Sequence, residues 1–198
     1  MAAGASTVPA SSTLVGSLWP ADRAGAVRGA VLVLLATGLL TVSAKVQVPF
    51  WPVPMTMQTM VVLMIGAAMG WRLGSAAVVA YLIEGALGLP VFAGTPERGL
   101  GLAYMAGPTG GFLVGFLAAT VVTGCLAEQG FGRTLPRLLV SMAIGHVVIF
   151  AFGLAWLSLH VGATQAWVLG AAPFVAGTLV KTVLAAALIQ AGWFVARR

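Results

Sequence analysis

The chain has 198 residues and a mean hydropathy of +1.05, and 60% of its residues are hydrophobic against only 7% that are charged. An average soluble domain carries about a quarter charged residues, so this composition excludes such a domain and, more firmly, a disordered chain. The net charge of +6 is scattered singly among apolar runs, which argues against a basic nucleic-acid-binding face and favours an integral membrane protein.

The first segment, residues 1–24, is rich in alanine, serine, threonine and glycine, and we expect a flexible tail there. We expect residues 25–198 to form one integral membrane, substrate-binding domain. Arg23 and Arg28 ahead of an apolar run resemble the start of a secretory signal peptide. The long tail before these arginines and the further apolar segments favour a retained first helix over a cleaved signal.

Six apolar segments follow, and each is close to the ~20 residues that a helix needs to cross ~30 Å of hydrocarbon. The proline-rich stretch 49–54 ends the first, because proline lacks an N–H donor and clashes with the preceding turn. Gly70 to Arg72 indicate a tight turn, and Gly88 to Gly111 a longer loop. The sequence therefore predicts an all-α fold, a six-transmembrane-helix bundle with helices over 26–48, 54–70, 72–89, 108–128, 136–159 and 171–196.

The cationic residues indicate how this bundle is oriented. If both termini are cytoplasmic, Lys45 and Arg98 fall toward the outside and Lys181 lies within the membrane. All the other cations then fall on the cytoplasmic side, as the positive-inside rule requires. They are Arg23, Arg28, Arg72, Arg133, Arg137, Arg197 and Arg198. We therefore predict cytoplasmic N- and C-termini.

Small residues recur at four-residue spacing, which lets helix backbones approach closely in lipid. Gly111, Gly115 and Ala119 form one such row, and packing inside the bundle explains it. Ala26 and Ala30 form another on the first helix, either for packing or as a docking face for a partner subunit. The sequence has no GxxxxGK[ST] loop, so any use of ATP requires another chain.

Ionisable groups inside a membrane are costly, so each needs a reason. Lys181 on the last helix and Glu84 on the third both lie about 12 Å below the outer surface, at ~1.5 Å of rise per residue. We expect them to meet in an outward-facing pocket for a small anionic ligand. The alternatives are a plain ion pair, or a lysine whose ammonium group reaches up to the interface.

Other polar residues carry weaker signals. Gln58, one turn into the second helix, is a ligand candidate because a buried amide needs partners. His146 and His160 lack metal-ligand neighbours and are interpreted as packing residues, so no metal site is predicted. The few acidic residues are scattered and no catalytic motif occurs, so no enzyme is expected.

Four stretches together resemble the BioY family, the biotin-specific S components of energy-coupling factor (ECF) transporters. They contain PVPMTMQT, a GLPVFAG element, GPTGG and PFVAGTLVK, at residues 52–59, 81–94, 107–116 and 173–181. The resemblance covers roughly 26–196. It implies a six-helix bundle in the cytoplasmic (inner) membrane that takes up biotin from outside. It also implies partners, a transmembrane coupling subunit and a pair of ABC-type ATPase subunits.

The resemblance assigns further roles along the chain. Ala26 and Ala30 match the alanine spacing that contacts the coupling subunit, and the loop with Pro49, Trp51 and Pro54 would act as a gate. No cofactor is expected in this chain, because biotin is the transported ligand and the partner subunits use ATP. Other vitamins, or a self-sufficient secondary carrier, remain alternative functions.

Biotin has an apolar bicycle, a ureido group and a carboxylate, and it requires a largely apolar pocket with a few polar groups. Lys181 or Arg98 would bind the carboxylate, and Glu84, Gln58 or Thr178 the ureido group. Tyr81, Phe92 and Tyr104 are expected to form apolar walls. The family's last element is usually PFxxGDxxK, so Thr178 stands at its acidic position and Glu84 is expected to replace the missing carboxylate.

Overall fold

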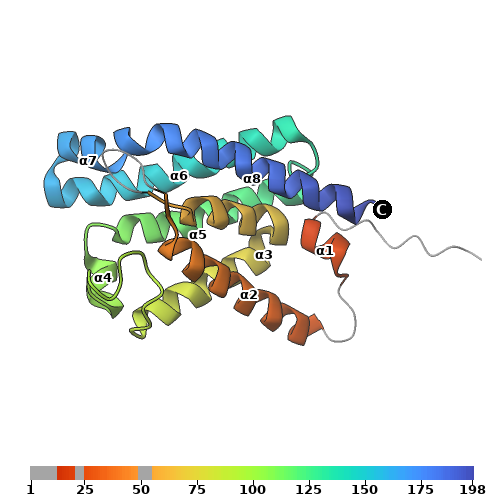
Figure 1. Cartoon of the computed structure of the whole chain (residues 1–198), viewed down its shortest axis with the longest axis horizontal. Helices are drawn as coiled ribbons and strands as arrows, with labels where there is room; N and C mark the ends of the chain where they lie inside the picture. The colour runs from red at the N-terminus through yellow and green to blue at the C-terminus, as the bar shows by residue number, and fades with distance from the viewer. Residues whose placement is uncertain (1–12, 21–24, 49–54) are drawn as a thin grey trace, which may run out of the picture.

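Long helices dominate the fold, and the structure, a computed structural model, describes residues 13–20, 25–48 and 55–198. In Figure 1 these helices lie side by side, with α4 and α7 at one end and α1 and the C-terminus at the other. The elements are α1 (Leu14–Leu18), α2 (Gly25–Lys45), β1 (Gln47–Val48), β2 (Met55–Thr56), α3 (Gln58–Ala86), α4 (Gly101–Ala106), α5 (Gly110–Glu128), α6 (Leu135–Val161), α7 (Ala163–Gly170), the 3₁₀ turn η1 (Ala172–Phe174) and α8 (Val175–Ala196).

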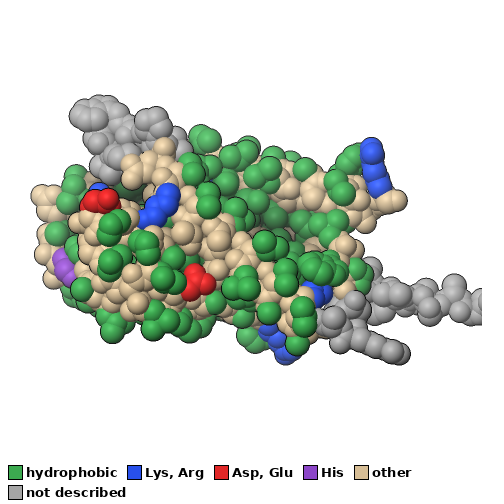
Figure 2. Space-filling view, turned by 60° about the horizontal axis from the view of Figure 1, so that its bottom comes forward, with side chains coloured by type: hydrophobic (Ala, Val, Ile, Leu, Met, Phe, Trp, Pro, Cys, Tyr) green, Lys and Arg blue, Asp and Glu red, His purple; other side chains and the backbone are tan. Residues whose placement is uncertain are grey.

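Five helical stretches of the described chain are long and apolar enough to cross a membrane: α2, α3, α5, α6 and the run 163–196 that ends with α8. Their most apolar windows have mean hydropathies between 1.6 and 2.3. Large apolar side chains also face outward, for example Leu159 at 80% exposure. Figure 2 shows hydrophobic side chains across much of one face, with few charged ones. Such a surface suits lipid and not water, so this is a multi-pass membrane protein.

The chain reverses direction inside α3. The backbone at Gly70 is non-helical, with φ of 78°, a value that glycine adopts without steric cost. A Cβ atom on Gly74 would lie 3.4 Å from the carbonyl oxygen of Ile65. Gln58 and Tyr81 share a 2.7 Å hydrogen bond although a continuous helix would hold residues 23 apart at ~34 Å. The turn predicted at Gly70 is therefore confirmed.

The small residues on α5 allow α6 to pack closely against it. A Cβ atom on Gly111 would lie 2.6 Å from the carbonyl oxygen of Phe152, and one on Gly115 would lie 3.0 Å from that of Ile149. Ala119, the next member of the row, is fully buried. The predicted packing role of this row is confirmed, because larger side chains would force the two helices apart.

Within the described residues the structure contains three short helices and one pair of strands that the sequence did not predict. Within the expected tail 1–24, residues 14–18 form α1, whose Leu14 is buried against Gly192 of α8. The expected loop between Gly88 and Gly111 contains the short helix α4, and α7 precedes α8. The all-α expectation misses a small antiparallel pair, in which Gln47 opposes Thr56.

Most of the described cations that were predicted to share a side lie toward the end with α1 and the C-terminus. There the backbone N–H of Trp71 donates to Glu128, and the Arg197 guanidinium donates to the carbonyl oxygen of Arg133. Arg28 donates to the carbonyl oxygen of Val15 in α1. Lys45 instead contacts the loop between α3 and α4, which places it toward the opposite end.

Candidate functional site

A cavity of about 320 Å³ lies among the helix ends near α4 and α7. This volume falls in the ~300–1,000 Å³ range of small-molecule sites. Its walls come from β2, the start of α3, the α3–α4 loop, α4, α5, α6, the end of α7, η1 and the start of α8. The residues that line it include Met55, Thr56, Gln58, Thr59, Arg98, Tyr104, Phe112, Phe116, His146, Phe150, Phe174, Thr178 and Lys181.

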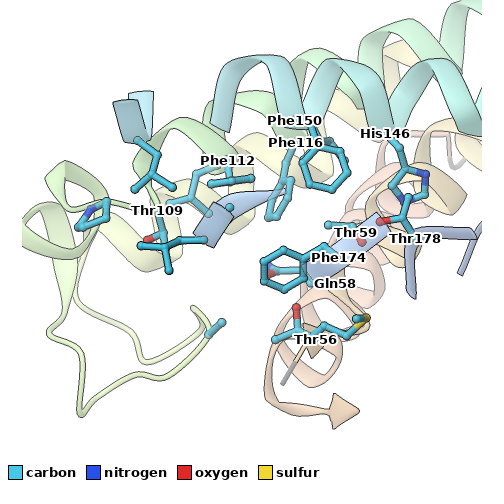
Figure 3. A pocket seen from close by; sticks show the side chains of 18 of the residues that line it. Thr56, Gln58, Thr59, Thr109, Phe112, Phe116, His146, Phe150, Phe174 and Thr178 are labelled. Carbon is cyan, nitrogen blue, oxygen red and sulfur yellow. The ribbon is translucent and has the colours of Figure 1, made fainter. Parts of the chain in front are cut away.

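Aromatic rings form much of the cavity wall. Figure 3 shows Phe112, Phe116, Phe150 and Phe174 around the space, with Thr59, Thr178 and His146 grouped on one side of it. Four phenyl rings offer a large apolar surface, and the polar groups are few and localised. This is the composition expected of a site for a mostly apolar small molecule with a few polar groups.

Lys181 is the buried cation of the cavity wall, with only 5% of its surface exposed. Its ammonium group donates to the hydroxyl oxygen of Thr59 at 2.9 Å and to the carbonyl oxygen of Thr56 at 3.3 Å. An ammonium group carries three N–H donors, so these two bonds leave one for a ligand. Gly177 makes room beside it, since a Cβ there would overlap the Met55 side chain.

Gln58 belongs to a buried hydrogen-bond chain behind the wall. Its amide nitrogen donates to the Tyr81 hydroxyl at 2.7 Å, and that hydroxyl donates to the carbonyl oxygen of Val91 at 3.0 Å. One of the two amide N–H donors is therefore engaged, which leaves the second N–H and the carbonyl oxygen of Gln58 for the cavity. The acceptor is held in place because Tyr81 is itself completely buried.

The loop between α3 and α4 contributes Arg98 and is fastened by Lys45. The Lys45 ammonium group donates to the carbonyl oxygens of Phe92 and Thr95 at 2.9 and 2.7 Å, and to the Thr95 hydroxyl at 2.8 Å. Arg98 lines the cavity from an exposed position in this loop. Tyr104 in α4 also lines it and donates its hydroxyl hydrogen to the carbonyl oxygen of Ala93.

His146 is part of the wall and is only 4% exposed. Its Nδ1 lies 3.1 Å from the carbonyl oxygen of Met142 and 3.2 Å from the Thr182 hydroxyl. That hydroxyl donates to the carbonyl oxygen of Thr178 at 2.8 Å. The other ring nitrogen, Nε2, is buried and has no hydrogen-bond partner within the described residues.

The expected meeting of Lys181 and Glu84 is wrong. Glu84 is half-buried on α3 and is not among the residues that line the cavity, and no ion pair joins it to Lys181 in the described part of the chain. Lys181 instead contacts Thr56 of β2 and Thr59 at the start of α3, more than twenty residues before Glu84 in the chain. Glu84 therefore projects from a face of α3 that does not line the cavity.

Tyr81 and Phe92 also lie elsewhere than expected, since neither lines the cavity. Phe92 packs into a space left by Gly85, where a Cβ atom would overlap its ring. Its ring meets the Tyr81 ring edge-on, with 5.4 Å between the ring centres, and stacks on the Tyr104 ring, with 4.9 Å between the centres. These two aromatic residues therefore support the wall from behind, whereas Tyr104 forms part of it.

The predicted gate and the predicted docking row are not part of the described cavity wall. Pro49, Trp51 and Pro54 of the predicted gate lie outside the described residues. Ala26 and Ala30 of the predicted docking row are both exposed on α2. The roles of these residues, and of Lys181, Arg98, Thr178, Gln58 and Tyr104 toward a ligand, stay predictions.

The phenylalanine walls were not predicted from the sequence, and His146 was interpreted only as a packing residue. Phe112 and Phe116 lie in or just after the GPTGG element, and Phe174 lies in the PFVAG element, so the motifs themselves carried a signal. His146 had no such signal, because its significance depends on a contact with α8 36 residues away.

Comparison with known proteins assigns the chain to a family. The sequence model of the BioY family matches residues 12–198. The biotin transporter BioY of Rhizobium etli is 40% identical over 168 residues, covering 80% of this chain and 86% of that protein. The probable biotin transporter BioY of Pyrococcus horikoshii is 38% identical over 159 residues, covering 80% and 92%.

The fold is also similar to a solved structure. The crystal structure of the S-component for biotin from an ECF-type ABC transporter aligns with a TM-score of 0.73 at 22% identity. The alignment covers 86% of this chain and 93% of the other. At this identity the likeness supports the fold alone, whereas the family match extends over nearly the whole sequence. The chain belongs to the BioY family.

Proposed function

We propose that this chain captures biotin on the outer side of the cytoplasmic membrane, as the S component of an ECF-type transporter. Its relatives are named transporters, so it is a transport protein and not an enzyme. The observation that carries the proposal is the 320 Å³ cavity with aromatic walls and a buried lysine. Its volume and mostly apolar lining suit the bicycle and aliphatic chain of biotin.

The polar groups of the cavity favour one orientation of the ligand. The side with Lys181, Gln58 and His146 offers both donors and acceptors, which matches a ureido group with its N–H donors and carbonyl acceptor. Arg98 offers only donors from the exposed loop, which matches a carboxylate that keeps part of its hydration there. The reverse orientation would bury the charged carboxylate and set the ureido N–H donors against Arg98, which has no acceptor.

Calorimetry on the purified full chain tests the substrate, with biotin, riboflavin and thiamine as titrants. We expect biotin alone to bind at micromolar concentration or below. Lys181→Met should weaken biotin binding about tenfold or more, because it removes a charge-assisted donor from a buried site. Glu84→Gln is the matched control and should bind like the parent, because Glu84 does not line the cavity.

Two results would count against this assignment. A parent protein that binds riboflavin or thiamine in preference to biotin would support an S component for another vitamin. Equal biotin affinity in the parent and in a folded Lys181→Met variant would remove Lys181 from the ligand site.

The membrane topology proposed with this function has six spans and cytoplasmic termini. The reversal at Gly70 supports it, because that turn divides α3 into two antiparallel helices. The distribution of cations supports the orientation, with Lys45 and Arg98 at one end and Arg133 and Arg197 at the other.

Protease accessibility tests this orientation. Trypsin added to right-side-out membrane vesicles should cleave after Arg98, which is exposed in the outer loop, and spare Arg133 and Arg137. Inside-out vesicles should give the opposite pattern. Cleavage at Arg137 but not at Arg98 in right-side-out vesicles would reverse the proposed orientation.

The proposal includes partners and no cofactor held by this chain. A transmembrane coupling subunit and a pair of ABC-type ATPase subunits would supply ATP hydrolysis. The exposed positions of Ala26 and Ala30 support a docking role for α2, because small side chains let a second helix approach closely. The loop with Pro49, Trp51 and Pro54 is proposed as the gate, since β1 and β2 on either side of it join α2 to the cavity wall.

A further inference from the structure

The two ring nitrogens of His146 have chemically different roles, and the contacts identify which one carries the hydrogen. A carbonyl oxygen only accepts hydrogen bonds, so Nδ1, 3.1 Å from the Met142 carbonyl oxygen, is the protonated nitrogen. The Thr182 hydroxyl gives its hydrogen to Thr178 and therefore also presents an acceptor to Nδ1. In the neutral ring, Nε2 is then left with a lone pair and acts as an acceptor.

This acceptor is unsatisfied as the chain stands. Nε2 is closed off from solvent and has no partner in the described part of the chain, while the His146 ring forms part of the cavity wall. Buried polar atoms are almost always paired, because an unpaired one loses its bond to water without replacement. His160, on the same helix, makes the same backbone contact through Nδ1 to Trp156, but its side chain is exposed to the surroundings.

We infer that His146 Nε2 accepts a hydrogen bond from a ureido N–H of the bound ligand. The inference rests on the proposed function, in which this side of the cavity holds the ureido group. Lys181 would contribute the complementary donor to the ureido carbonyl oxygen, because its bonds to Thr56 and Thr59 leave its third N–H free. His146 would then help to select cyclic ureas over acids of similar size, since an acid without N–H donors leaves Nε2 unpaired.

Two substitutions separate this role from a structural one. In His146→Asn the short amide reaches only the position of Nδ1, so it keeps a donor toward Met142 and loses the acceptor. In His146→Gln the longer amide places an acceptor oxygen where Nε2 stands. His160→Asn is the control on the same helix. Each full-length variant is purified with the parent, and its thermal unfolding is measured before titration with biotin and with biotinamide, which lacks the charged carboxylate.

We expect His146→Asn to weaken the binding of biotin and biotinamide by the same factor, about tenfold, because both ligands keep the ureido group. His146→Gln should recover most of this loss, and His160→Asn should bind like the parent. Arg98→Gln should show the opposite selectivity, with a loss for biotin and little for biotinamide.

The inference is overturned if a folded His146→Asn variant binds biotin like the parent. It is also overturned if the loss is confined to biotin, which would put His146 at the carboxylate, or if Gln and Asn lower the affinity equally. A parent protein that binds neither biotin nor biotinamide would instead contradict the proposed function itself, so the two failures are distinguishable.

Discussion

Lys45 is a cation that holds the α3–α4 loop in place without lining the cavity. Its ammonium group makes three hydrogen bonds, all to Phe92 and Thr95 in the α3–α4 loop. Those bonds use its three donors, so Lys45 is an anchor for the loop that carries Arg98 and not a second cation in the pocket.

Lys45→Met should therefore loosen this loop while leaving the helix bundle intact. The readout is the rate of tryptic cleavage after Arg98 in the detergent-solubilised protein, which reports local opening of the loop. We expect cleavage to be about tenfold faster than in the parent protein. Three fully buried charged hydrogen bonds would give a larger effect, but the Lys45 side chain is partly exposed to solvent, which weakens its bonds. Arg137→Met, an exposed cation at the other end, should leave the rate unchanged. An unchanged rate in Lys45→Met would show that other contacts hold the loop.

For a single residue, the sequence predicts the depth of a polar side chain in the membrane. It does not predict the direction in which that side chain points from its helix. Counting residues gave Lys181 and Glu84 the same depth, and nothing in the pattern revealed that they face different directions. A helix that is apolar on all sides has no polar face to indicate its rotation. Only contacts between distant segments, such as that of Lys181 with Thr59, fix this angle.

Among the elements, the long apolar helices were predictable because proline and glycine end them at recognisable positions. The reversal at Gly70 was predicted for the same reason, although the two halves of α3 are short. The helices α4 and α7 were missed, because they have only six and eight residues and lie beside glycine- and proline-rich turns. These short elements nevertheless position Tyr104 and Gly170 in the cavity wall.

The close contact of α5 with α6 explains why the GPTGG element marks part of the cavity wall. Gly110 and Gly111 of the GPTGG element bring the start of α5 against Trp156 and the Phe152 backbone. The indole N–H of Trp156 donates to the carbonyl oxygen of Gly107 at 3.0 Å, which fastens the turn before α5. The same motif thus sets the distance between two helices and directs Phe112 toward the ligand space.

At the scale of the whole described molecule, the cavity and most of the arginines lie at opposite ends. The cavity lies toward the end with α4 and α7, whereas the arginine-rich end holds α1 and the C-terminus. Helix α2 runs between these two ends, and most of its apolar length is not buried inside the described chain. Its exposed side offers an extended apolar face, including Val27, Leu34 and Leu35, on which a membrane-embedded partner can pack.

The double variant Ala26→Leu, Ala30→Leu distinguishes the binding of biotin by this chain from the uptake of biotin by the whole transporter. The change adds bulk only on the outside of α2, where both residues are exposed, so the affinity for biotin measured by calorimetry should stay within about twofold of the parent. In cells that also express a coupling subunit and ATPases, biotin uptake should fall at least about tenfold, because close helix packing in lipid requires small side chains. Ala143→Leu, another exposed alanine on α6, should change neither quantity. Equal uptake by the α2 variant and the parent would exclude docking through this row, and uptake by the parent without ATPases would favour a self-sufficient carrier.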